Sequence, residues 1–208
     1  MIGAETVRQA LSDPAITEVI VLVRSKPELQ HEKLTTVIHT DFNNYNGLEI
    51  YFDRADALIW CLGISQTQVS KEQYHIITYD YVKSCAAFCQ AIHPAIRFVF
   101  VSGDGADRSE KSRTLFRRIK GKAENALLAS GLQNLIIARP DAVRPRHKNK
   151  KAPFVYKLAY PFFPLVEWLA PHKIIWSDVL GRALVRLARN GAAQNTLENV
   201  ELRQLGAS

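Results

Sequence analysis

Polar and turn residues that could contact a ligand follow two apolar runs in the middle of the chain. Ser102 and Gly103 end the run 98–101, and Arg139 and Pro140 end the run 135–138. Short apolar runs of this kind are typical of buried parallel strands. Ligands of parallel sheets bind beyond the carboxyl ends of the strands, so these four residues are expected at a binding edge.

The residues between the two runs have the pattern of a crossover helix. A strand, a helix and a second parallel strand form one unit of a doubly wound sheet, which predicts an α/β fold. Further strands are expected at 18–24, 35–39, 57–61 and 197–202, the first of them buried on both faces. Helices are expected at 1–11, 43–53, 73–92 and 177–190. The apolar stripe of helix 73–92 is Tyr74, Ile77, Tyr81, Cys85, Phe88 and Ile92.

The size and composition of the chain suit a single domain. It has 208 residues, of which 47% are apolar, enough for a complete hydrophobic core. No apolar run reaches the roughly 18 residues of a membrane span, and the first residues lack the layout of a secretion signal. Three cysteines, two of them at 85 and 89 on one expected helix, favour buried thiols in a reducing compartment. No cysteine or histidine spacing indicates a metal site.

The formal net charge of +7 is partly local. Five basic residues lie within eight positions, and we expect a solvated loop there, with contact to an anionic ligand or surface as the alternative. No aromatic interleaving or known module indicates nucleic acid as a partner. The aromatic segment 154–169 is expected to pack on the sheet, or else to dock on a membrane surface or a partner. The five basic residues are Arg144, Arg146, Lys148, Lys150 and Lys151.

Several of these strand ends, taken in order, resemble a known family. The chain resembles the atypical or extended short-chain dehydrogenase/reductases that bind NAD(P)H, close to their TIP30-like and NmrA-like groups. The resemblance covers about residues 1–145 and implies a Rossmann-like NAD(P)-binding domain, with 146–208 as a small, partly helical C-terminal segment on the substrate side. The matching motifs are Leu22-Val23-Arg24-Ser25, Thr40-Asp41-Phe42, Trp60-Cys61-Leu62-Gly63, Val101-Ser102-Gly103, Lys120-Gly121-Lys122-Ala123-Glu124 and Ala138-Arg139-Pro140.

One expected part of the family pattern is incomplete at the start of the chain. The family has a glycine-rich turn after its first strand, and Gly3 resembles the third glycine of that turn. The central first strand and the first two glycines are therefore expected to be missing. A misassigned start, a shortened pseudoenzyme, or another segment or chain that fills the gap would each explain this.

The resemblance also implies which residues bind the cofactor. Arg24 resembles the basic residue that contacts a ribose 2′-phosphate, which favours NADP over NAD; the alternative is an ordinary solvated arginine. Asp41 and Phe42 resemble the pair beside the adenine, although Asp41 could instead cap the next helix. The strand-end residues expected to line the cofactor are Cys61, Leu62, Gly63 and Pro140.

The catalytic pattern of the family is only partly present. It consists of Tyr-x-x-x-Lys and an upstream Ser, in which the tyrosine hydroxyl transfers a proton and the lysine lowers the tyrosine pKa and holds the nicotinamide ribose. Lys120 and Ser102 match the lysine and serine, but Phe116 stands at the tyrosine position. Lys120 could instead be a surface lysine, and Ser102 could simply end its strand. Substitute proton donors would have to come from Tyr156, Tyr160 or His172.

Two kinds of function follow from these features. The first is an NADP-dependent oxidoreductase for a small organic substrate, such as a biosynthetic tailoring reductase, dehydrogenase or isomerase. The second is a non-catalytic NAD(P)-binding regulatory protein or a truncated pseudoenzyme that binds no dinucleotide. We further expect a cytoplasmic protein that could form a homo-oligomer.

Overall fold

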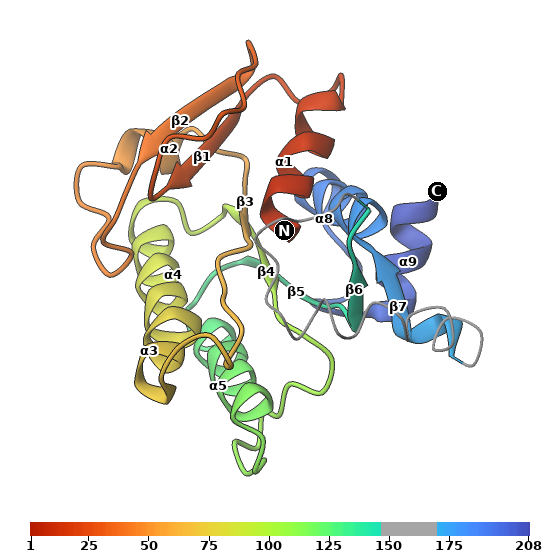
Figure 1. Cartoon of the computed structure of the whole chain (residues 1–208). Coiled ribbons are helices and arrows are strands. Elements are labelled where there is room, and N and C mark those ends of the chain that lie inside the picture. The colour runs from red at the N-terminus through yellow and green to blue at the C-terminus, as the bar shows by residue number, and fades with distance from the viewer. Residues whose placement is uncertain (147–169) are drawn as a thin grey trace.

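Parallel strands form the centre of the molecule, with helices on both sides (Figure 1). The computed structural model describes residues 1–146 and 170–208. The largest sheet has the order β3–β4–β5–β8, in which every neighbouring pair is parallel. Its strands are β3 (Ala57–Trp60), β4 (Arg97–Val101), β5 (Asn134–Arg139) and β8 (Thr196–Glu198). This arrangement confirms the expected doubly wound α/β class.

Two earlier strands form a separate parallel sheet. β1 (Val19–Val23) pairs with β2 (Leu34–Ile38), and Leu22 lies opposite Val37. The expectation that Val19–Val23 shares one hydrogen-bonded sheet with Phe98 and Phe100 is therefore wrong. The physical reason is that no strand among the described residues pairs with both β1 and β3, so no hydrogen bonds join the two sheets. Leu22 and Leu58 nevertheless pack on the same hydrophobic cluster, so the two sheets share a core.

Two groups of helices cover the sheets, one group on each face. α4 (Tyr81–Ile92) and α5 (Leu115–Leu128) pack with β3 and β4 around Phe98 and Phe100. On the other side, α1 (Ile2–Ser12) packs against α8 (Ser177–Asn190), which also contacts β3 and β4. α9 (Asn199–Ala207) packs against α8, as Figure 1 shows. Helices α1 and α8 lie close to where their apolar periodicity predicts them.

Several expected boundaries are wrong for local reasons. The five residues of β1 are all half-buried rather than buried on both faces, because this strand has a neighbour on one side only among the described residues. Helix α2 is confined to Glu49–Asp53. The strand expected at 197–202 is only β8, after which α9 begins at Asn199. Helix 73–92 is divided into α3 (Lys71–His75), a π-helical turn (Ile76–Asp80) and α4.

The remaining elements extend the edge where β5 ends. β6 (Ala142–Arg144) pairs in parallel with β7 (Ile174–Trp176), which follows the 3-10 turn Pro171–Lys173. Arg144 and Arg146 of the predicted basic loop lie over the Trp176 ring, at 4.3 and 5.2 Å from its centroid. The rest of that loop, the aromatic segment 154–169 and the two candidate tyrosines Tyr156 and Tyr160 lie outside the described residues.

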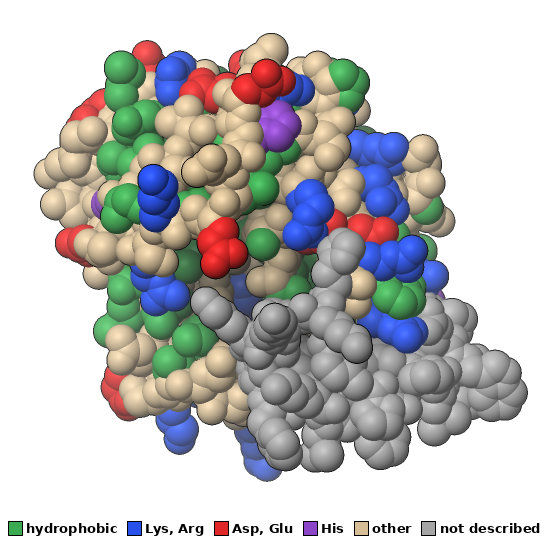
Figure 2. Space-filling model, turned by 45° about the horizontal axis from the view of Figure 1, so that its top comes forward, with side chains coloured by type: hydrophobic (Ala, Val, Ile, Leu, Met, Phe, Trp, Pro, Cys, Tyr) green, Lys and Arg blue, Asp and Glu red, His purple; other side chains and the backbone are tan. Residues whose placement is uncertain are grey.

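The surface charges and the lengths of the helices can be compared with the expected partners of the protein. On the face shown in Figure 2, acidic side chains lie beside several of the basic ones. Within 1–146 and 170–208, no helix has both the length and the apolar character needed to cross a membrane. The same residues hold no cluster of metal-ligating side chains. That nucleic acid is not a partner stays a prediction.

Candidate functional site

Ser102 lies at the carboxyl end of β4, where its hydroxyl contacts a buried carboxylate. Its Oγ donates a hydrogen bond of 2.5 Å to Oε1 of Glu124 on α5, and the Glu124 side chain is completely buried. The Ser102 backbone N–H donates to the carbonyl of Ala138, which fixes the end of β4 against β5. Ser102 is therefore positioned at the expected edge, but its hydroxyl proton is already used within the protein.

Two arginines neutralise the buried Glu124 carboxylate. Arg108 Nε donates to Glu124 Oε2 at 2.7 Å, and Arg139 Nε donates to Oε1 at 2.9 Å. The Arg139 pKa is raised above its usual value, chiefly by its hydrogen bond to Glu124. Arg139 Nη1 also reaches Glu198 at 3.1 Å, so the network extends to the end of β8. A buried charge of this kind is tolerated because every oxygen has a charged or hydroxyl donor.

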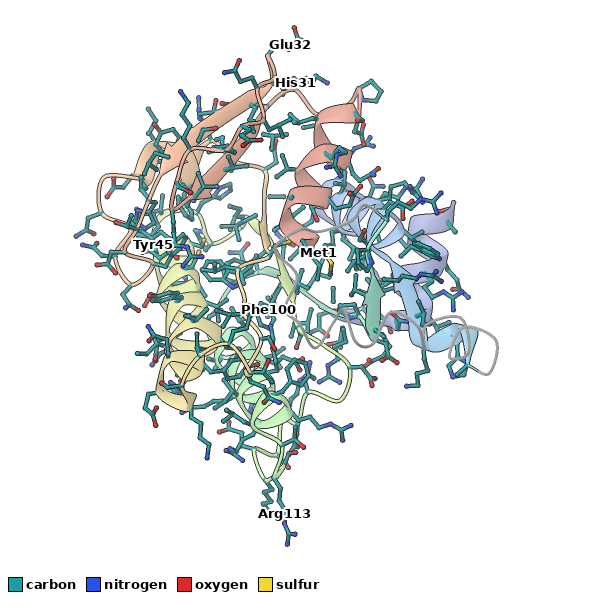
Figure 3. All side chains as sticks on the ribbon, in the orientation of Figure 1. Met1, His31, Glu32, Tyr45, Phe100 and Arg113 are labelled. Carbon is teal, nitrogen blue, oxygen red and sulfur yellow. The ribbon has the colours of Figure 1, made fainter. Side chains whose placement is uncertain are left out.

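Lys120 lies one helical turn before Glu124 on α5 and is also buried. Its Nζ donates to the Val101 carbonyl at 2.9 Å and lies 4.8 Å from the centroid of the Phe100 ring. Figure 3 shows Phe100 between the central strands and α5. Burial lowers the pKa of the Lys120 ammonium to about 8, while the nearby Glu124 acts in the opposite direction. The burial of Lys120 excludes the alternative that it is a surface lysine.

The first residues of α1 lie against the end of β3. A Cβ atom added to Gly3 would be 3.3 Å from Cβ of Cys61, and the Thr6 Oγ1 is 3.9 Å from the Cys61 Sγ. Burial raises the pKa of the Cys61 thiol to about 11, and the hydrogen bond from Thr6 partly opposes this shift. Lys120 also acts on the Cys61 pKa. The start of α1, the end of β3 and the buried amine of α5 therefore form one neighbourhood.

Phe116, at the position of the family tyrosine, lies against the loop that follows β4. A Cβ atom on Gly103 would be 2.6 Å from Cζ of the Phe116 ring, so only glycine allows this contact. The Phe116 backbone N–H donates to Gln66 Oε1, which ties the start of α5 to the loop after β3. The ring thus occupies the edge beside Ser102 without offering a proton. Arg113, two residues before the start of α5, points away from the body of the protein (Figure 3).

The expected adenosine-side residues are spread over different environments. Arg24 is exposed at the end of β1. Asp41 is exposed, and its Oδ1 accepts a hydrogen bond from the Asn43 N–H at 3.0 Å. Phe42 is buried among aromatic rings, with its centroid 5.0 Å from His39 and 6.5 Å from Trp60.

The other residues that were expected to line the cofactor lie just after the ends of β3 and β5. Leu62 packs on the cluster that contains Phe98, whereas Cys61 packs on the opposite cluster. Gly63 is exposed, with no atom within 4 Å of an added Cβ. Pro140 is buried, and its carbonyl accepts the Asp104 N–H at 2.9 Å. Of the substitute donors, His172 is exposed in the turn before β7.

The structure thus forms two clusters from residues that the sequence analysis names singly. One contains Gly3, Cys61 and Lys120, and the other contains Ser102 and Arg139. Sequence reasoning assigned no role to Glu124 or Thr6, which hold these clusters together. The spacing of Lys120 and Glu124, one helical turn apart, was an available signal for a shared helix face.

The lowered pKa of Lys120 predicts a pH-dependent stability difference. A lysine titrates near 10.5 when unfolded and near 8 here, so between these values the unfolded chain binds more protons. The cost of burying the charged amine is full below pH 8 and disappears as pH rises to 10.5. Replacing Lys120 by Met removes that cost. We expect the stability advantage of Lys120→Met over the unsubstituted protein to shrink by about 3 kcal/mol across this window.

Urea unfolding of both proteins at several pH values from 7 to 10.5 measures this difference. The raised pKa of Cys61 has an opposing effect, because the folded thiol retains its proton between pH 9 and 11. That effect is common to both proteins and largely cancels in the difference. A stability difference that stays constant with pH would contradict the assignment of Lys120 as a buried amine with a lowered pKa.

Comparison with known proteins identifies relatives with mitochondrial names. Protein fmp52, mitochondrial, of Emericella nidulans is 26% identical over 195 residues, which cover 89% of this chain and 82% of that protein. The FMP52 protein of Lodderomyces elongisporus is 26% identical over 96% of this chain and 87% of its own length. These names overturn the expected cytoplasmic location, because both relatives are mitochondrial proteins. The absence of a recognisable secretion signal did not distinguish these two compartments.

Solved structures support the fold at low sequence identity. The Bordetella bronchiseptica enzyme WbmF, in complex with NAD+, matches with a TM-score of 0.70 and 12% identity over 98% of this chain and 73% of WbmF. The UDP-glucose 4-epimerase of Thermotoga maritima matches with a TM-score of 0.69 and 13% identity over 95% of this chain and 73% of the enzyme. The profile of the family described as NAD(P)H-binding matches residues 1–155 and indicates a nicotinamide dinucleotide as the cofactor class. The chain therefore belongs to the NAD(P)H-binding family, with the Rossmann-like fold of an atypical short-chain dehydrogenase/reductase.

Proposed function

We propose that this protein binds NADP at the carboxyl-end edge of its parallel strands and acts as a non-catalytic, cofactor-dependent regulatory protein. The observation that carries the proposal is the Phe116 ring against Gly103, where the family mechanism needs a tyrosine hydroxyl. Ser102 adds to this, because its hydroxyl donates to Glu124 instead of facing a substrate oxygen. Following its relatives, we place the protein in mitochondria.

Lys120 supplies a suitable donor for the dinucleotide. An ammonium group has three N–H donors, and in the described residues the Lys120 Nζ makes one hydrogen bond, to the Val101 carbonyl. The remaining donors fit the ribose hydroxyls of a nicotinamide cofactor. Gly63 adds open space at the end of β3, where the backbone can be approached closely. When bound, the cofactor would supply hydride chemistry, and Lys120 would hold and orient its ribose.

The preference for NADP rests on the end of β1. Arg24 and Lys26 are both exposed there, and neither has an acidic partner within residues 1–146 and 170–208. Two cations at this position favour a ribose 2′-phosphate, whereas a carboxylate would favour the free 2′-hydroxyl of NAD. We therefore propose Arg24 as the residue that selects NADP.

Titration of NADPH and NADH against four proteins tests both parts of the proposal. We expect Arg24→Met to weaken NADPH binding at least about tenfold and to leave NADH binding unchanged, because one charged hydrogen bond is worth about 1.5–3 kcal/mol. Lys120→Met is expected to weaken both cofactors. Lys71→Met, an exposed lysine on α3, serves as the control and should change neither. Absence of binding in the unsubstituted protein contradicts the proposal, and equal losses for both cofactors in Arg24→Met contradict the NADP preference.

One observation favours a second candidate, an NADP-dependent oxidoreductase that acts on a small organic substrate. The Lys120 pKa of about 8 would let its ammonium give up a proton near neutral pH, in place of the missing tyrosine. NADPH oxidation with a panel of small aldehydes and ketones tests this candidate. Turnover by the unsubstituted protein that is absent from Lys120→Met even at saturating NADPH supports this candidate. If neither protein turns over a substrate, the regulatory role remains.

A further inference from the structure

A second cluster of titratable side chains, which includes neither Lys120 nor Ser102, lies between α3 and α5. His75 is the last residue of α3, Asp80 ends the π-helical turn, and Lys122 lies on α5. The His75 Nδ1 is 3.1 Å from Asp80 Oδ2, and its Nε2 is 3.2 Å from the Lys122 Nζ. A carboxylate, an imidazole and an amine are thus connected in series, and nothing in the family resemblance accounts for them.

The π-helical turn is what brings His75 and Asp80 together. Residues five apart on an α-helix lie about 140° apart around its axis and do not face one another. In the turn Ile76–Asp80 the Tyr81 N–H donates to the Ile76 carbonyl, a five-residue spacing that widens the helix and aligns such pairs. Single π turns of this kind occur frequently at functional sites.

The hydrogen-bond chain suits one tautomer of the neutral imidazole. An ammonium only donates, so in that tautomer the His75 Nε2 accepts from Lys122. The proton of the neutral ring then lies on Nδ1, which donates to the Asp80 carboxylate. This is the arrangement of a general base that a carboxylate orients, with the amine of Lys122 as the group from which it takes a proton.

Lys122 is accessible enough to react, and its environment differs from that of a neighbouring lysine. The side chain is half-buried, and its Nζ lies 4.5 Å from the centroid of the Tyr79 ring. Lys83 lies over the same ring at 5.8 Å and is more exposed. No hydrogen bond joins Lys83 to an imidazole in the described residues. Lys122 therefore has a base beside its amine, and Lys83 does not.

We propose that Lys122 is a self-acylation site that takes acyl groups from small acyl thioesters, with His75 as the general base and Asp80 as its orienting group. The ammonium first loses one proton to solvent. The neutral nitrogen then attacks the thioester carbonyl carbon, an N–C bond forms and the C–S bond breaks. His75 Nε2 accepts the second nitrogen proton and passes it to the departing thiolate, so the products are an amide and a free thiol.

Acylation would change the contact between the two helices. The amide has no positive charge, so the cation–π contact of Lys122 with the Tyr79 ring would be lost, and only a neutral N–H would remain to donate to His75. Lys122 is two residues from Lys120, and α5 carries both side chains. The modification would therefore change the contacts of the helix that holds the proposed cofactor lysine. The acylation itself does not depend on cofactor binding.

Incubation of the full chain with acetyl-coenzyme A tests the proposal, with the acetylated lysines quantified by mass spectrometry over time. Lys122 is expected to react at least about ten times faster than Lys83, although Lys83 is more exposed. A rate that followed exposure alone would favour Lys83. Because both lysines are in one folded molecule, this comparison needs no variant, and equal rates at the two positions would overturn the proposal.

Two variants then test the role of each partner. In His75→Gln the Lys122 rate should fall to that of Lys83, while the Lys83 rate stays constant. In Asp80→Asn the Lys122 rate should fall several-fold, because the ring loses the carboxylate that orients it. Circular dichroism and the unchanged Lys83 rate report that each variant is folded. A Lys122 rate that is the same in His75→Gln as in the unsubstituted protein would overturn the assignment of His75 as the base.

Discussion

Gly121→Ala is expected to lower the free energy of unfolding by at least about 3 kcal/mol, among the largest effects of any single methyl group in this chain. A Cβ atom at this position would be 1.8 Å from the carbonyl oxygen of Asp107 and 2.1 Å from its carbon. The obstacle is backbone, so no side-chain rotation relieves the clash. Either α5 or the loop before it must move, although alanine would otherwise favour the helix by about 1 kcal/mol.

The loop at Asp107 has little freedom to move. Its carboxylate accepts the Ser109 N–H at 2.9 Å and the Ser112 N–H at 2.7 Å, and its own N–H donates to the Arg117 carbonyl at 2.9 Å. These bonds hold the loop against α5, where Lys120 and Glu124 project. We therefore expect the substitution to disturb the Arg108–Glu124 contact as well as the overall stability.

Gly181→Ala is the matched control, because Gly181 also lies within a long helix. An added Cβ there would be 3.1 Å from Cγ of the Gln9 side chain and 3.4 Å from the Glu5 carbonyl oxygen, so a shift of a few tenths of an ångström would accommodate it. Urea unfolding should show Gly181→Ala within about 1 kcal/mol of the unsubstituted protein. If Gly121→Ala were as stable as Gly181→Ala, the close packing of α5 on the Asp107 loop would be refuted.

Glu124→Gln is expected to cost about 3–5 kcal/mol, because it breaks a buried ion pair from one side only. The amide has nearly the size of the carboxylate, so packing is preserved and the change tests charge. Arg108 and Arg139 would then face a neutral group, and the amide would place a donor against their N–H groups. Ser102 would lose the strong acceptor of its hydroxyl proton.

The ion pair of Glu18 with Arg54 provides the comparison. Its N–O distance is 2.9 Å, similar to the 2.7 Å between Arg108 and Glu124, but the Glu18 side chain is 37% exposed whereas Glu124 is 0% exposed. Glu18→Gln should therefore change the free energy of unfolding by no more than about 1 kcal/mol. Similar losses in both variants would mean that the Glu124 network contributes no more than a surface pair.

The sequence was sufficient for elements whose burial follows their periodicity. Helix 177–190 coincides with α8, because its apolar residues face α1 and the sheet without interruption. Helix 73–92 is less regular. The π turn inserts extra backbone width, so Thr78 is buried while Ile92 is 36% exposed, and the expected stripe through Ile77 and Ile92 is only partly correct. Asp80, on that turn, is half-exposed beside His75.

The end of the chain was misjudged for a different reason. Residues 197–202 alternate weakly and suggested a strand, but Glu198 accepts from the N–H of Glu201 while the Glu201 side chain accepts from the N–H of Glu198. This reciprocal cap starts α9 at once. Glutamate is an unusual first member of such a cap, which usually begins with serine or threonine, so the signal was easy to miss.

The candidate site could be located from the sequence but not assembled from it. The strand ends correctly placed Ser102 and Arg139 at one edge, because parallel strands end together. That the Ser102 hydroxyl would donate to Glu124 depends on how α5 lies across β4, which residues 22 positions apart do not reveal. Likewise, the clash that keeps position 103 a glycine appears only once the Phe116 ring is placed.

The Glu124 network also has a consequence for the order in which the chain can fold during synthesis. Arg108 and Arg139 lie 16 and 15 residues from Glu124, so the carboxylate can be neutralised soon after that stretch leaves the ribosome. Arg108 must then wait for Thr196, 88 residues further along, before its second hydrogen bond can form. A nascent chain that ends before β8 would hold a neutralised carboxylate but would lack the hydrogen bond that Arg108 donates to Thr196, so such incomplete chains should be exposed to chaperones and proteases.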